Sequence, residues 1–185
     1  KPEKFAKQVF HQANKKHLLK TDVFCYGDWR IINKRHMEHI HYTIQINAPQ
    51  RKVWDTMLGE ETYAQWASAF NSDTSVESSV EGGWDEGSDI RFLGKEKDGT
   101  VSGMIGKIQE SRPGEFISIK YSGEIMHGKK NMYGPDELYF ENYTFKEKDG
   151  GTELIVDIDV KDEYKDMFNG MWPKALETLK QLAEK

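Results

Sequence analysis

The stretch Phe168–Leu182, which reads FNGMWPKALETLKQL, decides the fold. Its apolar residues recur every three or four positions and would form one stripe along a helix: Phe168, Met171, Trp172, Ala175, Leu176, Leu179 and Leu182. No other segment in the later two thirds of the chain has a comparable helical pattern. We therefore predict a single long amphipathic helix near the C-terminus.

The region before this helix is typical of antiparallel strands. Apolar and polar residues alternate most clearly in Thr152–Val160, and the Asp149-Gly150 pair is a hairpin-turn signal. The predicted strands are Thr74–Val80, Asp89–Lys95, Val101–Glu110, Phe116–Ser122, Leu138–Lys146 and Thr152–Val160. Glu124–Glu137 is the one long irregular stretch, and we predict a loop there that either acts as a lid or is simply mobile.

An earlier strand and two short helices precede these strands. Ile40–Ile46 alternates between apolar and polar residues, and helical spacing follows up to Leu58 and again from Glu60 to Ala69, with Gly59 between. The prediction is an α+β fold, with a curved antiparallel sheet of about six to seven strands wrapped around the C-terminal helix. Such an arrangement tends to leave a cavity between the sheet and the helix.

Composition limits the class of protein. The 185 residues include only one cysteine, Cys25, so an intrachain disulfide is impossible, and we expect a reducing, cytoplasmic location. No run of 18 apolar residues is present, so no membrane span is expected.

Charge divides the chain in two. Residues 1–41 hold nine Lys and Arg against four Asp and Glu, whereas the remainder has a net charge of -10. We interpret residues 1–36 as a basic N-terminal extension or an artificial leader, with a weak helix candidate at Lys4–Leu19 and a hairpin candidate at Val23–Ile32, and residues 37–185 as the folded domain. The acidic remainder argues against a nucleic-acid partner.

A family resemblance covers about residues 38–184, and it rests on short motifs that follow one another in a characteristic order. They are Ile44–Pro49, Val53-Trp54, Tyr63–Trp66, Trp84–Ser88, Gly103–Lys107, Pro113–Ile119, Glu141–Phe145, Gly151–Leu154 and Gly170–Pro173. The chain resembles the Aha-type branch, the activator of heat-shock-protein ATPase homologues, of the START-like (SRPBCC) superfamily. The resemblance implies a helix-grip fold with a deep apolar cavity. It implies no single function, because the superfamily includes lipid carriers, hormone receptors, aromatic cyclases and a chaperone activator.

Inward-facing aromatic and methionine side chains would line that cavity. The candidate ligand-binding residues are Trp66, Phe70, Phe92, Met104, Ile119, Tyr121, Glu141, Tyr143, Phe168, Met171 and Trp172. Such side chains offer large, adaptable apolar surfaces to a ligand. The alternative is that they simply fill the core.

Glu141 is the sharpest single candidate. Strand alternation places it on the same face as Tyr139, Tyr143 and Phe145, which we assign inward. A carboxylate there needs a partner or stays protonated, and it would orient a polar group of a ligand or act as a general base. The alternative is that Glu141 lies near the edge of its strand or pairs with a lysine.

Other chemistry finds little support in the sequence. His36, His39 and His41 form an H-x-x-H-x-H motif, but no second cluster supplies further ligands, so no metal and no cofactor are predicted. His127 has no visible nucleophile partner, and no catalytic residue is assigned.

The primary hypothesis is therefore the binding of a small hydrophobic or amphipathic molecule in the cavity. The first alternative is a protein-interaction module that modulates a chaperone ATPase or another partner. The second is a cyclase- or hydrolase-like enzyme, for which Glu141 is the only inward acid–base group. Such an enzyme needs an inward acid–base pair, so we rank this alternative last.

Overall fold

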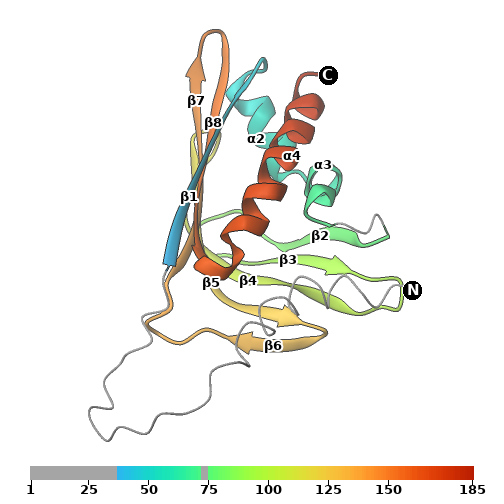
Figure 1. The fold of residues 1–185 in the computed structure, drawn as a ribbon. Coiled ribbons are helices and arrows are strands. Elements are labelled where there is room, and N and C mark those ends of the chain that lie inside the picture. The colour runs from blue at the N-terminus through green and yellow to red at the C-terminus, as the bar shows by residue number, and fades with distance from the viewer. Residues whose placement is uncertain (1–36, 72–74) are drawn as a thin grey trace, which may run out of the picture.

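The computed structural model describes residues 37–71 and 75–185 (Figure 1). The predicted helix at 4–19, the predicted hairpin at 23–32, and His36 lie outside the described residues. In chain order the elements are β1 (Met37–Ile46), α2 (Gln50–Leu58), α3 (Glu60–Ala67), η2 (Ser68–Phe70), β2 (Glu77–Gly82), β3 (Asp89–Lys95), β4 (Val101–Arg112), β5 (Phe116–Met126), β6 (Lys129–Met132), β7 (Tyr139–Lys148), β8 (Gly151–Lys161), η3 (Asp162–Tyr164) and α4 (Lys165–Ala183).

One antiparallel sheet of eight strands forms the body of the fold. Its strands run in the order β1-β8-β7-β5-β4-β3-β2, and β6 pairs with β5 outside this path. Figure 1 shows the sheet curving around α4, with α2 and α3 beside that helix. The predicted α+β architecture, with a curved sheet gripping a long C-terminal helix, is confirmed, and the sheet has one strand more than predicted.

Irregular pairing between β4 and β5 accompanies the bend of the sheet. The register shifts between Ile105 and Gly106, and again between Ile108 and Glu110. A bulge inserts an extra residue into one strand, which bends that strand and increases its twist. The long central strands therefore turn toward α4 rather than continuing as a flat surface.

The predicted loop at Glu124–Glu137 is wrong for half of its length, because residues 124–126 and 129–132 are in strands. Strand β5 continues to Met126, and β6 returns beside it after a two-residue turn. Both turn residues, His127 and Gly128, have positive φ (49° and 77°), the conformation that tight hairpins of this kind require. The first nine residues of the segment thus form a hairpin of the sheet, so the predicted lid is wrong there.

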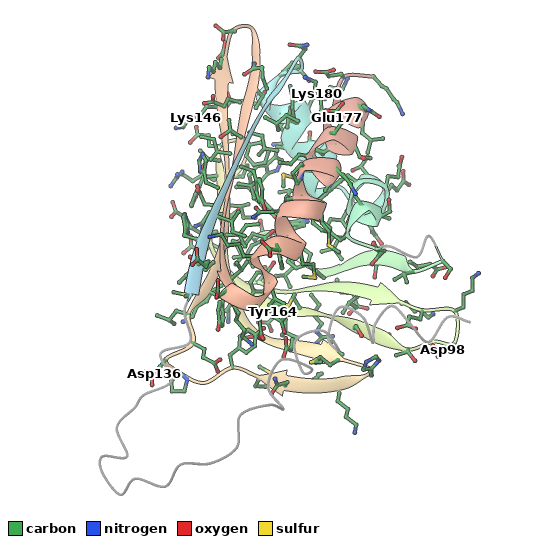
Figure 2. All side chains as sticks on the ribbon, in the orientation of Figure 1. Asp98, Asp136, Lys146, Tyr164, Glu177 and Lys180 are labelled. Atoms are coloured by element: carbon green, nitrogen blue, oxygen red, sulfur yellow. The ribbon has the colours of Figure 1, made fainter. Side chains whose placement is uncertain are left out.

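The two halves of helix α4 differ in how deeply their apolar side chains are buried. Towards its C-terminal end Ala175, Leu176 and Leu179 are buried in the main core, as the apolar stripe predicts. Towards its N-terminal end Phe168 and Met171 are only half-buried. Tyr164 lies at the start of the helix, whereas Glu177 lies on its outer surface near the other end (Figure 2).

The helix runs through Pro173 without a break, and this residue is exposed. In the part of the chain that the structure describes, none of the helices combines the length and the apolar character needed to cross a bilayer.

Candidate functional site

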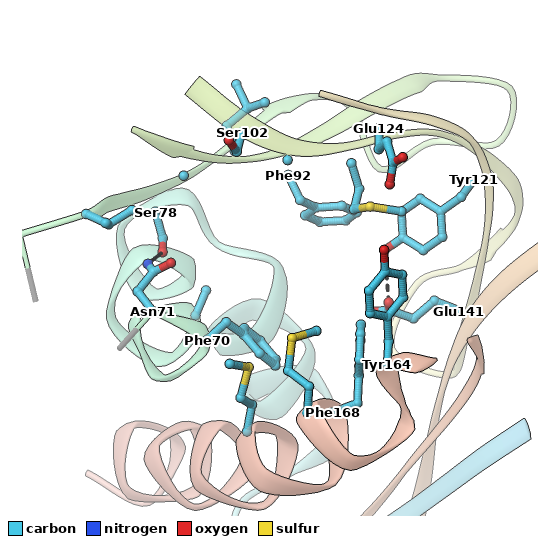
Figure 3. Close-up of a pocket in the computed structure, with 18 of the residues that line it drawn as sticks. Phe70, Asn71, Ser78, Phe92, Ser102, Tyr121, Glu124, Glu141, Tyr164 and Phe168 are labelled. Atoms are coloured by element: carbon cyan, nitrogen blue, oxygen red, sulfur yellow. Dashed lines mark hydrogen bonds between the residues drawn. The ribbon is translucent and has the colours of Figure 1, made fainter. Parts of the chain in front are cut away.

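A cavity of about 500 Å³ lies between the sheet and the N-terminal half of α4 (Figure 3). Its wall is built from elements that are far apart in the sequence. Tyr63, Trp66 and Phe70 come from α3 and η2, Phe92 and Met104 from β3 and β4, Tyr121 and Tyr143 from β5 and β7, and Phe168, Met171 and Trp172 from α4. A concave, largely apolar pocket of this size is typical of small-molecule sites.

Ten of the eleven predicted site residues lie at this wall. The exception is Ile119, which is fully buried in the core cluster and does not line the cavity. Ile119 pairs with Glu141 across β5 and β7, so the predicted face is correct. Strand alternation gives the face of a residue but not its depth, and at Ile119 the face is covered by other core side chains.

The aromatic side chains of the wall contact one another. The rings of Phe70 and Trp172 meet edge to face with their centroids 5.0 Å apart, and Trp66 lies 6.0 Å from Phe70. Elsewhere on the wall, the ring centroid of Phe92 lies 5.7 Å from that of Tyr63 and 6.1 Å from that of Tyr121. Because aromatic pairs hold preferred geometries, these contacts keep the wall in one shape before any ligand arrives.

Glu141 is the central polar group of the wall. Its side chain is buried, with the residue 7% exposed, so the inward position predicted from alternation is confirmed. The Tyr121 hydroxyl donates a hydrogen bond to Oε2 over 2.9 Å, and the Tyr143 hydroxyl donates to Oε1. The alternative pairing with a lysine is wrong, because two tyrosines from β5 and β7 take that place.

Burial sets the ionisation of this cluster. Burial raises the pKa of Glu141 above its ordinary value of 4.5, and the hydrogen bonds from Tyr143 and Tyr121 oppose that rise. Burial, together with the nearby Glu141 carboxylate, also raises the pKa of Tyr63, Tyr121 and Tyr143. The three phenols therefore stay protonated and remain able to donate hydrogen bonds.

A second polar cluster lines the same cavity and was not predicted. Glu124 is buried and accepts hydrogen bonds from Asn131 Nδ2 over 2.9 Å and from the Tyr133 hydroxyl over 3.4 Å. The Lys161 ammonium lies 5.2 Å from the centroid of the Tyr133 ring, with Tyr139 and Tyr164 also within 6.0 Å. Figure 3 shows Glu124, Tyr121, Glu141 and Tyr164 gathered at one end of the pocket, away from Asn71 and Ser78.

The indole N–H of Trp172 is an unusual hydrogen-bond donor. Its indole Nε1 is buried and has no hydrogen-bond partner among the described residues, although the ring lines the cavity. Buried polar groups are nearly always paired in folded proteins, so an orphan donor calls for an explanation.

Two histidines of the H-x-x-H-x-H motif, His39 and His41, contact acidic side chains of the neighbouring strand β8. His39 Nδ1 lies 3.0 Å from Asp159 Oδ1, and His41 Nδ1 lies 2.7 Å from Asp157 Oδ1, both on an exposed surface. The hydrogen bond with Asp159 raises the pKa of His39. Within residues 37–71 and 75–185, no group of three or more His, Cys, Asp or Glu side chains is arranged to hold a metal ion.

One family of known proteins matches the sequence. The sequence model described as activator of Hsp90 ATPase homolog 1-like protein matches residues 47–184. No match was found among curated proteins.

Solved structures of similar fold come from several bacteria. An AHSA1-like protein from Aeromonas hydrophila has a TM-score of 0.62 and 15% identity, covering 80% of this chain and 92% of that one. A protein from Chromobacterium violaceum has a TM-score of 0.61 and 18% identity, covering 80% and 97%. A protein from Nitrosomonas europaea has a TM-score of 0.60 and 11% identity, covering 78% and 92%. At such identities the likeness shows the fold alone.

Proposed function

The chain belongs to the family of activator of Hsp90 ATPase homolog 1-like proteins, and from this premise we propose that it binds a small hydrophobic or amphipathic molecule in the cavity beneath α4. The observation that carries the proposal is the cavity of about 500 Å³ with a continuous aromatic wall. We place this binding in the cytoplasm, because Cys25 is the only cysteine.

Two features of the wall support a ligand-binding cavity over a gap left by imperfect packing of the core. Protein interiors are close-packed, and they contain few voids larger than a water molecule. The cavity wall also includes a polar group in an apolar setting, the carboxylate of Glu141. A few polar groups among many apolar ones are what fixes the orientation of a bound molecule.

The mechanism would be burial of apolar surface. Each square ångström of apolar surface removed from water contributes about 25 cal/mol. The rings of Trp66, Phe92 and Trp172 would take the apolar body of the ligand, and Glu141 would take one polar group. Because the aromatic wall is already in place, little ordering would be needed on binding.

A fluorescence titration with N-phenylnaphthylamine tests this proposal. This neutral apolar probe becomes bright when it leaves water, and we expect saturable one-to-one binding by the full chain. The variant Met104→Trp places a larger side chain at the cavity wall and should weaken binding by about tenfold or more. The matched control is Met132→Trp, because Met132 is 57% exposed and does not line the cavity.

Two results would count against the proposal. One is non-saturable fluorescence with the wild-type chain, which indicates only surface adsorption. The other is equal affinity of Met104→Trp and wild type while both remain folded by circular dichroism.

A second candidate function is modulation of a chaperone ATPase, favoured by the description of the family. The net charge of -10 in residues 42–185 would suit a basic surface on the partner. Steady-state ATP hydrolysis by Hsp90 with and without the purified chain tests it. An unchanged rate, together with no complex in size-exclusion chromatography, would remove this candidate.

A further inference from the structure

We propose that the ligand is a lipophilic amine, whose protonated nitrogen binds the Glu141 carboxylate while its apolar body fills the aromatic cavity. This inference rests on the proposed function and names the chemical class of its ligand. It follows from the geometry of Glu141, the charges around the cavity and the nature of its wall.

The Glu141 carboxylate has acceptor capacity left for a ligand. Tyr121 and Tyr143 each donate one hydrogen bond, and they bind different oxygens. A carboxylate offers about four lone-pair sites, so about two remain open. Since Glu141 lines the cavity, a donor placed inside it can reach those sites.

No protein cation accompanies this carboxylate among the described residues. Its ionisation is influenced by burial and by the two tyrosines, with no contribution from a lysine, arginine or histidine. A buried charge without a counter-charge is unfavourable, and protein groups normally supply one. An ammonium ion carried by the ligand would supply the missing charge.

Acidic side chains outnumber basic ones among the buried and half-buried residues of the wall. The buried and half-buried charged residues at the cavity are Glu96, Glu124 and Glu141 against Lys161. Asp98 is exposed, and the Asp159 carboxylate binds His39 on the outer surface, so neither is counted here. Lys97 is exposed, and the Lys161 ammonium already lies over tyrosine rings next to the Glu124 cluster. The field inside the cavity therefore favours a cation over an anion.

The aromatic wall adds to this preference. The faces of aromatic rings carry partial negative charge and attract cations, most strongly for tryptophan. Trp66, Phe92 and Trp172 would thus favour a nitrogen cation as well as an apolar body. They offer no comparable attraction to a carboxylate.

An anionic amphiphile is the main competing class of ligand. It would have to bind Lys161, which is half-buried, and leave Glu141 uncompensated in the same cavity. The experiment below separates these two classes directly.

The test uses three competitors that share one naphthylethyl body. They are naphthylethylamine (a cation), naphthylethyl methyl ether (neutral, with no donor) and naphthylpropionate (an anion). Each displaces N-phenylnaphthylamine from the full chain at neutral pH. We expect the amine to bind at least about tenfold more tightly than the ether, and the anion to bind more weakly than the ether, since hydrogen bonds between charged groups are about twice as strong as neutral ones.

The variant Glu141→Gln should remove the preference for the amine and leave the ether's affinity within about twofold, because the amide keeps the shape but not the charge. Glu124→Gln is the matched control, since this acid lies in the same cavity and should retain most of the preference. Loss of the preference in Glu124→Gln instead of Glu141→Gln would overturn the assignment.

The pH dependence gives a second readout. Because burial raises the pKa of Glu141, amine binding should strengthen as the pH rises through that value, whereas ether binding should not change. The titrating groups that face Glu141 are Tyr63 from α3, Tyr121 from β5 and Tyr143 from β7, and their raised pKa values keep them neutral over this range.

The outcomes distinguish this inference from the proposed function. If the ether displaces the probe but the amine binds no more tightly, or the anion binds best, the amine inference fails and the cavity remains a binding site. If neither the probe nor any competitor binds, the proposed function itself fails.

Discussion

Glu141 is one buried residue that links the stability of the fold to the proposed binding of a ligand. Its carboxylate lies among aromatic side chains and depends on two tyrosine hydroxyls for solvation. A buried acid of this kind adds little to the stability of the fold compared with a neutral side chain of the same shape. We propose that a ligand uses it.

Replacing Glu141 by glutamine should therefore make stability less sensitive to pH. The pKa of Glu141 is raised in the folded chain, so the folded state binds the proton more tightly than the unfolded state. Its contribution to stability is fully present below the ordinary value of 4.5 and is lost as the pH rises through the raised value. We expect the unfolding free energy of Glu141→Gln, relative to wild type, to increase over that range.

Urea denaturation at a series of pH values measures this difference. The control is Glu147→Gln, an exposed glutamate on the same strand, which should follow wild type at every pH. A constant difference between Glu141→Gln and wild type across the range would show that Glu141 does not titrate as described.

At the scale of residues, strand alternation in the sequence was a good guide to direction. It placed Glu141, Tyr121 and Tyr143 on the inward face, and all three are buried at the cavity. It placed Ile119 on the same face but could not show that the core covers it there. The alternation of apolar and polar residues shows which face of the sheet a side chain is on, but not where along the sheet it lies. That position decides whether the side chain lies in the core or at the cavity.

At the scale of elements, the hairpin of β5 and β6 is the largest departure from the prediction. The sequence from Glu124 to Glu137 contains charged residues, two glycines and a proline, which is typical of a loop. The turn signal was the His127-Gly128 pair, which matches the Asp149-Gly150 turn between β7 and β8 in having two positive φ values. Because this turn was not predicted, the inward position of the Glu124 side chain was not predicted either. That position follows from the continuation of β5 past Ser122.

Gly128→Ala should lower the free energy of unfolding by about 1–2 kcal/mol, because an L-residue with a side chain is disfavoured at positive φ. Nothing lies within 4 Å of a Cβ atom added there, so the loss would be conformational rather than steric. Gly134→Ala is the control, since Gly134 does not have positive φ and the nearest atom, Glu137 Oε2, lies 3.6 Å away. Urea denaturation compares the two variants.

Equal stabilities of the two variants would contradict the hairpin turn. A selective loss in Gly128→Ala would support the extended β5 and, with it, the placement of Glu124 in the cavity wall.

At the scale of the whole molecule, the fold follows from one helix and the strands around it. The apolar stripe of α4 and the alternation of β8 were sufficient to predict a gripped helix, because each needs an apolar partner surface. They were not sufficient to predict an open cavity. A filled core and a lined cavity require the same apolar pattern, and only the three-dimensional arrangement of Phe92, Phe168 and Met171 distinguishes them.

The measurement that tests the central claim most directly is a ¹H–¹⁵N spectrum of the tryptophan indole groups with and without naphthylethyl methyl ether. Trp66 and Trp172 line the cavity, whereas Trp54 is buried in the core away from it. We predict that the indole signals of Trp66 and Trp172 shift on saturation and that the signal of Trp54 does not. Unchanged signals for Trp66 and Trp172 at saturating ligand would contradict a binding site in this cavity.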